Sequence, residues 1–158
     1  MIDTFCLSPE SVEENITPYT RAIVSVDIFG QSSDIDGLMK IAEKHNLQIV
    51  SDTAQAPGAH YREKYAGTLT HIGGYSLNYH KHIHTGEGGI VVTHDDDYAD
   101  RVRLIRNHAE EVVEGMKQQS LINMIGHNYR MGEIEAAIGI EQLKKLTELV
   151  ASRQCVAE

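Results

Sequence analysis

The sequence is poor in cysteine, in basic residues and in long apolar runs, and each shortage excludes a class of protein. Cys6 and Cys155 stand at opposite ends of the chain, so neither a disulfide framework nor a thiolate metal site is predicted. We therefore expect a reducing compartment, most simply the cytoplasm. Only 14 lysines and arginines face 23 acidic residues, which excludes a nucleic-acid footprint and gives no support for binding to anionic membranes.

Neither an export signal nor a membrane segment is recognisable. The first residues, MIDTFCLSPESVEENI, carry acidic side chains in place of the basic and apolar stretches of a leader. No segment approaches the ~18 uninterrupted apolar residues of a membrane-spanning helix. The 158 residues, 41% of them apolar, fit one domain or a large part of one.

Periodic patterns predict an α/β fold. A strand over 22–28, a helix over 34–45 and a strand over 47–50 follow one another with short links, and such units build parallel sheets covered by helices. The first strand is β-branched and almost entirely apolar, which is typical of a strand that is covered on both faces. The other predicted elements are helices over 8–16 and 95–106 and strands over 74–77 and 89–93.

A long amphipathic helix is predicted over 132–152. Its apolar residues recur at helical spacing and are expected to face inward: Ile134, Ala137, Ile138, Ile140, Leu143, Leu146 and Leu149. Function in a parallel sheet sits at the C-terminal ends of the strands. The polar segments 27–31 and 52–55, which follow two predicted strands, are therefore the expected location of a site.

The segment 75–89 combines one lysine with three histidines at alternate positions and three glycines. If the segment is extended, His80, His82 and His84 project from one side and could bind zinc or copper together with Glu87. The alternatives are that they are surface loop residues or that they line the approach of a substrate. The glycines are expected to let the loop turn tightly, while Glu87 holds it by hydrogen bonds.

Four stretches of the chain resemble the DegT/StrS family of sugar aminotransferases, which depend on pyridoxal phosphate and have the aspartate-aminotransferase type of fold. They are SDTAQAPGAHY, GGYSLNYHKHIHTGEGGIVVT, RLIRNHA and GHNYRMGEIEAAIG, in the family's order. The specific part of the match is an Asp and Gln pair, a Ser five residues before a Lys, and the TGEGG that follows.

The resemblance implies the α/β fold of a type I pyridoxal-phosphate transferase, with a mostly parallel sheet covered by helices. Members of the family are more than twice as long as this chain. Residues 1–158 are therefore expected to form the central and C-terminal part of the cofactor-binding large domain, without the family's N-terminal segment and its small C-terminal domain.

The resemblance also implies roles for individual residues. Lys81 would form the Schiff base with pyridoxal phosphate and later move a proton between substrate and cofactor, because a lysine amine is nucleophilic when burial or nearby positive charge keeps it neutral. Asp52 matches the carboxylate that faces the pyridine nitrogen. Considered alone, Asp52 could instead cap a helix that starts near Ala54. Gln55 matches the residue beside the cofactor's ring hydroxyl.

Two further matches concern the phosphate of the cofactor. Ser76 matches a serine whose hydroxyl binds this phosphate. Asn128 resembles an asparagine that reaches across a dimer interface to the phosphate of the neighbouring subunit, which implies a homodimer with a shared active site. The alternative for Asn128 is a turn residue before the following helix.

The activity implied is transfer of an amino group from glutamate or glutamine to a keto sugar, nucleotide-linked or related, in the biosynthesis of sugars or cell-surface polysaccharides. One branch of the family carries histidine at the lysine position and dehydrates its sugar. Lys81 stands five residues after Ser76, which favours the aminotransferase and leaves the dehydratase second. The non-enzymatic alternatives are a truncated, inactive homologue and a histidine-loop metal binder.

Overall fold

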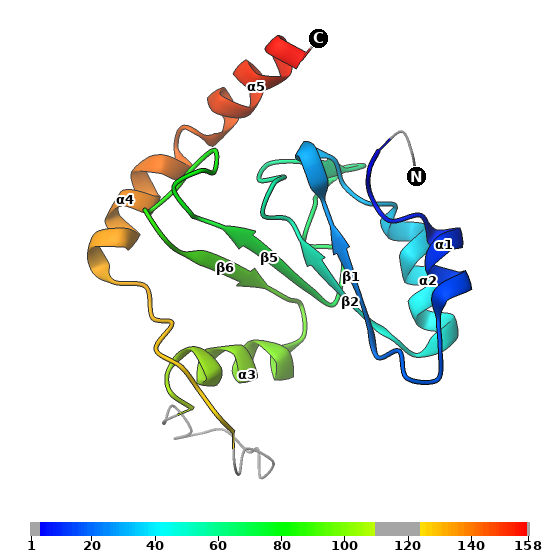
Figure 1. The fold of residues 1–158 in the computed structure, drawn as a ribbon. Helices are drawn as coiled ribbons and strands as arrows, with labels where there is room; N and C mark the ends of the chain where they lie inside the picture. Colours follow the sequence, from blue (N-terminus) through cyan, green and yellow to red (C-terminus); the bar gives the residue numbers. More distant parts are fainter. Residues whose placement is uncertain (1–3, 110–123, 158) are drawn as a thin grey trace.

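The structure is a computed structural model that describes residues 4–109 and 124–157, built around a four-stranded sheet (Figure 1). The strands lie side by side in the order β1 (Ala22–Val26), β2 (Gln48–Asp52), β5 (Ile72–Ser76) and β6 (Gly89–Val92). The first three are parallel, and β6 runs antiparallel to β5. This mostly parallel sheet with its helices confirms the predicted fold class.

Two helices, α1 (Pro9–Asn15) and α2 (Ile35–His45), pack together beside β1 and β2 (Figure 1). Ser8 caps α1 and Asp34 caps α2, each through a side-chain oxygen that accepts a backbone N–H. The helix predicted over 34–45 thus forms as expected, with its apolar face inward. The core cluster consists of Ile23, Leu38, Ile41, Ala42, Leu47 and Ile49.

Only one face of β1 is covered, which corrects the prediction of a strand buried on both faces. Ile23 is buried, whereas Val24 is 58% exposed. Among the described strands, β1 lies at the edge of the sheet and pairs with β2 alone. An apolar run does not reveal how many layers cover it, because β-branched residues suit a half-covered strand equally well. The strand ends at Val26, and a single 3₁₀ turn, η1 (Ile28–Gly30), follows it.

The predicted helix over 132–152 is two helices, α4 (Glu133–Leu143) and α5 (Leu146–Ala157). The N–H of Lys145 donates to the carbonyl of Gln142 at 3.0 Å, three residues back, so the regular α-helical ladder ends there. The apolar periodicity runs through this break unchanged, which is why the pattern predicts one helix.

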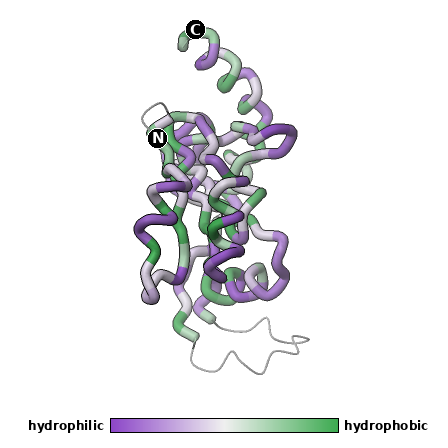
Figure 2. The backbone as a smooth tube through the Cα atoms, turned by 90° about the vertical axis from the view of Figure 1, so that its right-hand side faces the viewer, coloured by the Kyte–Doolittle hydropathy of each residue, from purple (hydrophilic) through white to green (hydrophobic). Residues whose placement is uncertain are grey.

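The apolar side chains of α4 do not face inward as predicted. Ile134 is 76% exposed and Leu143 60% exposed, because no other element of the described chain packs against this side of α4. α5 projects from the body of the fold and carries hydrophobic and hydrophilic residues in turn (Figure 2). Within the described residues, no helix is long and apolar enough to cross a membrane.

The remaining helix of the described chain, α3 (Asp96–Arg106), follows β6 where the sequence predicts a helix over 95–106, and the structure shows Asp95 as its cap. A hairpin of two short strands, β3 (His60–Tyr61) and β4 (Lys64–Tyr65), was not predicted. It is held against α2 by the hydroxyl of Tyr61, which donates to Oδ1 of Asp34 at 3.0 Å. Burial raises the pKa of Tyr61, so the phenol remains a donor at neutral pH.

The chain segment around Gly67 crosses β5 in direct backbone contact. A Cβ added to Gly73 would stand 1.8 Å from the carbonyl oxygen of Gly67. The hydroxyl of Tyr75 donates to the carbonyl of Ala66 beside it. Burial and the charge of Asp27 raise the pKa of Tyr75, which keeps this donor protonated. The connection between β2 and β5 is therefore fixed onto the sheet.

Gly73→Ala is expected to destabilise the chain by at least about 3 kcal/mol, because the new methyl group would overlap backbone that cannot move aside. Gly74→Ala is the matched control, since the nearest atom to its added Cβ, the carbonyl oxygen of Ser51, is 4.0 Å away. Chemical denaturation of both variants measures the difference. Equal stabilities would contradict the backbone contact between Gly73 and Gly67.

Candidate active site

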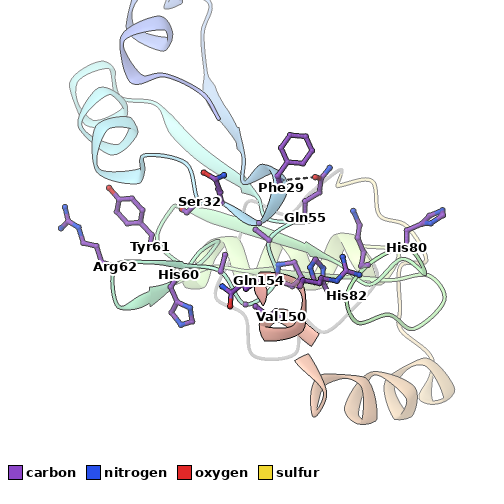
Figure 3. A pocket seen from close by; sticks show the side chains of 18 residues that line it. Phe29, Ser32, Gln55, His60, Tyr61, Arg62, His80, His82, Val150 and Gln154 are labelled. Atoms are coloured by element: carbon purple, nitrogen blue, oxygen red, sulfur yellow. Dashed lines mark hydrogen bonds between the residues drawn. The ribbon is translucent and has the colours of Figure 1, made fainter. Parts of the chain in front are cut away.

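A cleft of roughly 1000 Å³ opens beside the C-terminal ends of β1 and β2, the edge at which the sequence predicts a site (Figure 3). Three stretches line it, namely residues 29–32 after β1, 55–62 after β2 and 80–82 after β5, together with Val150, Arg153 and Gln154 of α5. Segments from four parts of the chain therefore meet around one space.

The loops that follow β1 and β2 are tied together by Asp27. Its side chain is fully buried, Oδ1 accepts the N–H of Ser33 at 2.9 Å, and Oδ2 accepts the hydroxyl of Thr53 at 2.7 Å. A second link joins the N–H of Phe29 to Oε1 of Gln55 at 3.4 Å (Figure 3). A buried carboxylate is stable only when it is hydrogen-bonded, so these bonds hold both loops in place.

Lys81 lies in a turn after β5 and lines the cleft. Its N–H donates to the carbonyl of Asn78 at 2.9 Å, and the side-chain amide of Asn78 donates to Glu87 at 2.8 Å. Gly88 has a φ of 154°, and a Cβ there would come within 2.8 Å of Oγ1 of Thr85. The expectation of a tight glycine turn held by Glu87 is confirmed.

Asp52 and Gln55 follow one another out of β2. Oδ1 of Asp52 accepts the N–H of Ala54 at 3.0 Å, but residues 53–59 form turns, so no helix starts near Ala54 and the alternative of a helix cap is wrong. Gln55 lines the same cleft as Lys81. Its Oε1 accepts from Phe29, and its side-chain N–H groups have no partner among the described residues.

Ser76 and Asn128 occupy different places. Ser76 ends β5, and its Oγ accepts the N–H of Asn78 at 3.2 Å, so it stands at the base of the loop that carries Lys81. Asn128 is exposed and pairs with Asn107, just after α3, so it is not the simple turn residue of the alternative. Asp52, Ser76 and Asn128 are not among the residues that line the cleft.

The three histidines do not form the row that metal binding requires. The loop is folded into turns, so the expectation of an extended segment is wrong. His80 and His82 line the cleft, whereas His84 does not. In the described ranges 4–109 and 124–157, no group of three or more histidine, cysteine, aspartate or glutamate side chains is placed to hold a metal ion.

Local sequence patterns did not point to the contribution of α5 or of the β3–β4 hairpin to the cleft. Figure 3 shows Val150 and Gln154 on α5 close to His82, while Arg62 and His80 mark opposite ends of the cleft. Burial, followed by the positive charges of Arg153 and Lys81, lowers the pKa of His82. His82 is therefore neutral at physiological pH.

The mostly parallel sheet with its helices matches the large domain of type I pyridoxal-phosphate enzymes. The sequence profile of the DegT/DnrJ/EryC1/StrS aminotransferase family matches residues 1–158, and the chain belongs to this family.

The chain is similar to individual enzymes of this family. GDP-perosamine synthase of Caulobacter vibrioides is 40% identical over 153 residues, covering 97% of this chain and 40% of that protein. L-glutamine:2-deoxy-scyllo-inosose aminotransferase of Streptomyces fradiae is 39% identical over 161 residues, covering 98% of this chain and 38% of that protein. The structure of E. coli GDP-4-keto-6-deoxy-D-mannose-3-dehydratase with bound hydrated pyridoxal phosphate aligns with a TM-score of 0.84 at 30% identity, covering 99% and 44%. The chain thus spans about 40% of the length of the curated relatives it matches.

Arg153→Gln is expected to raise the pKa of His82, because it removes one of two positive charges that disfavour the imidazolium. In this variant the pKa of His82 should stay below the ordinary 6.5, since burial is unchanged. An NMR titration of the histidine rings measures the pKa of His82 in the wild type and in the variant, with Arg101→Gln on α3 as control. An unchanged titration of His82 in Arg153→Gln would contradict the proximity of Arg153 and His82.

The lowered pKa of His82 also affects stability. Its contribution is present above about pH 6.5 and is lost as the pH falls through the folded-state pKa.

Proposed function

We propose that the chain carries the catalytic core of a pyridoxal-phosphate-dependent aminotransferase, which moves an amino group from glutamate or glutamine to a keto sugar, nucleotide-linked or related. The reaction would serve the biosynthesis of sugars or cell-surface polysaccharides. The observation that carries the proposal is that Lys81 and Gln55, from two different strand ends, line one cleft. Relatives whose names describe a GDP-perosamine synthase and an L-glutamine-dependent aminotransferase support it. In this proposal residues 1–158 correspond to the central and C-terminal part of the large domain.

The residues present have the chemistry that this cofactor requires. Asp52 has no cationic partner among the described residues, so its carboxylate is available to hold a proton on the ring nitrogen. The bond from Phe29 fixes the amide of Gln55 with its N–H groups free to donate to the ring hydroxyl. The hydroxyl of Ser76 would donate to the phosphate. Pyridoxal phosphate, when bound, supplies an electron sink for the substrate carbon that loses or gains the amine.

Lys81 would have two roles in this scheme. Its amine attaches the cofactor, and once released it takes up and returns the proton that the transfer moves. The turn from Asn78 to Lys81 and the Asn78–Glu87 hydrogen bond fix the backbone that carries the amine. The neutral imidazole of His82 adds no positive charge to the cleft at physiological pH. Lys81 and Arg153 are therefore the main cationic groups on this side of it.

A sugar dehydratase of the same family is the second candidate function. The observation that favours it is the similarity to the E. coli dehydratase, with a TM-score of 0.84. His82 also lines the cleft directly beside Lys81, so an imidazole is at hand. We rank this function second because Lys81, five residues after Ser76, occupies the position of the aminotransferase lysine.

We further propose a homodimer in which Asn128 completes the site of the second copy. Asn128 does not line the cleft of its own chain. Apolar residues close to it in the sequence are strongly exposed, since Ile125 is 81%, Tyr129 68% and Ile134 76% exposed. Contiguous exposed apolar side chains mark interaction surfaces. A second copy that covers this surface could receive the amide of Asn128 at its phosphate position.

Pyridoxal phosphate added to the full chain is expected to attach to Lys81, because this lysine lines the cleft and a lysine amine can add to the cofactor's aldehyde. Borohydride reduction should make the link permanent, and peptide mass analysis should find it on residue 81. Lys81→Arg should abolish the link, whereas Lys64→Arg, on the exposed β4 strand, should leave it intact. An unmodified Lys81 at full cofactor loading would refute the proposal.

The shared site predicts complementation between two defective variants. Asn128→Asp should weaken cofactor binding roughly tenfold, because a negatively charged carboxylate replaces an amide that donates a hydrogen bond to the phosphate. Lys81→Arg should prevent attachment. Mixed after reversible dissociation, the two should form hybrid dimers in which one site pairs an intact Lys81 with an intact Asn128. Cofactor titration should then show tight attachment in part of the sample. If mixing restores no tight sites, Asn128 does not act across an interface.

A further inference from the structure

The cleft is lined by positive charges although the chain as a whole is acidic. Overall, 23 acidic residues outnumber 14 lysines and arginines. None of the described residues that line the cleft is acidic, while Arg62, Lys81 and Arg153 are cations. The histidines that line it are His60, His80 and His82. An anionic protein that keeps carboxylates out of one cleft presents a local positive potential there.

These cations differ in their availability. Arg62 forms a salt bridge with Asp36 on α2, and Figure 3 shows its side chain pointing away from the centre of the cleft. Among the described residues, no acidic side chain lies within ion-pair distance of Lys81 or Arg153. The cleft therefore contains two positive charges that the described part of the chain does not neutralise.

Packing of α5 brings Arg153 to the site. A Cβ at Gly58, in the loop that follows Gln55, would lie 3.3 Å from Cγ2 of Val150 and 3.8 Å from Cδ2 of Leu146. The first turns of α5 thus rest on this loop, and Arg153, one turn beyond Val150, faces the cleft. Burial is the largest cause of the lowered pKa of His82, and the charges of Arg153 and Lys81 lower it further, which is consistent with both cations lying near this ring.

We propose that Arg153 holds an anionic oxygen group of the substrate, a phosphate or a carboxylate, at the α5 wall of the cleft. This inference rests on the proposed function, in which Lys81 is committed to the cofactor's aldehyde and Ser76 and Asn128 to its phosphate. Arg153 is then the cation left for a second anion. A guanidinium can donate two parallel N–H bonds to either group. Both the diphosphate of a nucleotide-linked sugar and the α-carboxylate of an amino-acid donor have the required chemistry.

Calorimetric titration of the full chain, with and without pyridoxal phosphate, distinguishes these sources by using guanosine diphosphate and glutamate as separate probes. Arg153→Gln should weaken binding of one probe about fivefold or more, and should flatten its dependence on salt. Arg153→Lys should weaken binding less than Arg153→Gln does, because it keeps the charge but loses the pair of parallel N–H donors. Arg101→Gln should bind like the wild type, and circular dichroism verifies that every variant is folded. The probe that is weakened identifies the anion that Arg153 holds.

The inference and the proposed function fail separately. If Arg153→Gln binds both probes as tightly as the wild type while the cofactor attaches to Lys81, the role of Arg153 is refuted and the proposed function stands. If binding depends on Arg153 but the cofactor never attaches, the anion site stands and the aminotransferase proposal falls. A wild-type chain that binds neither probe also refutes the anion site.

Discussion

The buried carboxylate of Asp27 is the interaction on which the shape of the cleft depends. Parallel pairing brings the ends of β1 and β2 together, but it leaves the loops beyond them free to choose their paths. Asp27 removes that freedom, because it accepts one bond from Ser33, beyond the cleft-lining part of the first loop, and another from Thr53, at the start of the second. Losing either donor would leave one oxygen of a buried carboxylate without its hydrogen bond, which costs on the order of a few kcal/mol.

A second constraint acts on the same space from the side of β5. The backbone of Gly67 lies against Gly73, and Tyr75 bonds to Ala66, so the long connection from β2 returns across the strand that leads to Lys81. The loop with the Asp and Gln pair and the loop with the lysine are thereby held in fixed positions on the same sheet. Groups that must meet around a cofactor are positioned more accurately by strands than by flexible loops.

Local chemistry was sufficient to predict much of this fold. The helices predicted over 8–16, 34–45 and 95–106 and the inward face of α2 follow from rules that act within one or two helical turns. The β3–β4 hairpin escaped prediction because it has two residues per strand and depends on the distant Tyr61–Asp34 bond. The exposure of Val24 and of the apolar side of α4 was missed because a periodic pattern indicates a face but not what covers it.

The site shows the same division between local and distant information. Lys81, Gln55 and their strand ends were predicted from motifs, since each motif is contiguous. Arg153 was not, because nothing in the sequence of α5 distinguishes it from a solvated arginine until the helix packs on the loop at Gly58. The motif residues are those that contact a group shared by a whole family, which in the proposed function is pyridoxal phosphate. Residues that distinguish one substrate from another need only converge in space, so an unpaired cation from a remote helix is where selectivity among anionic substrates is expected to reside.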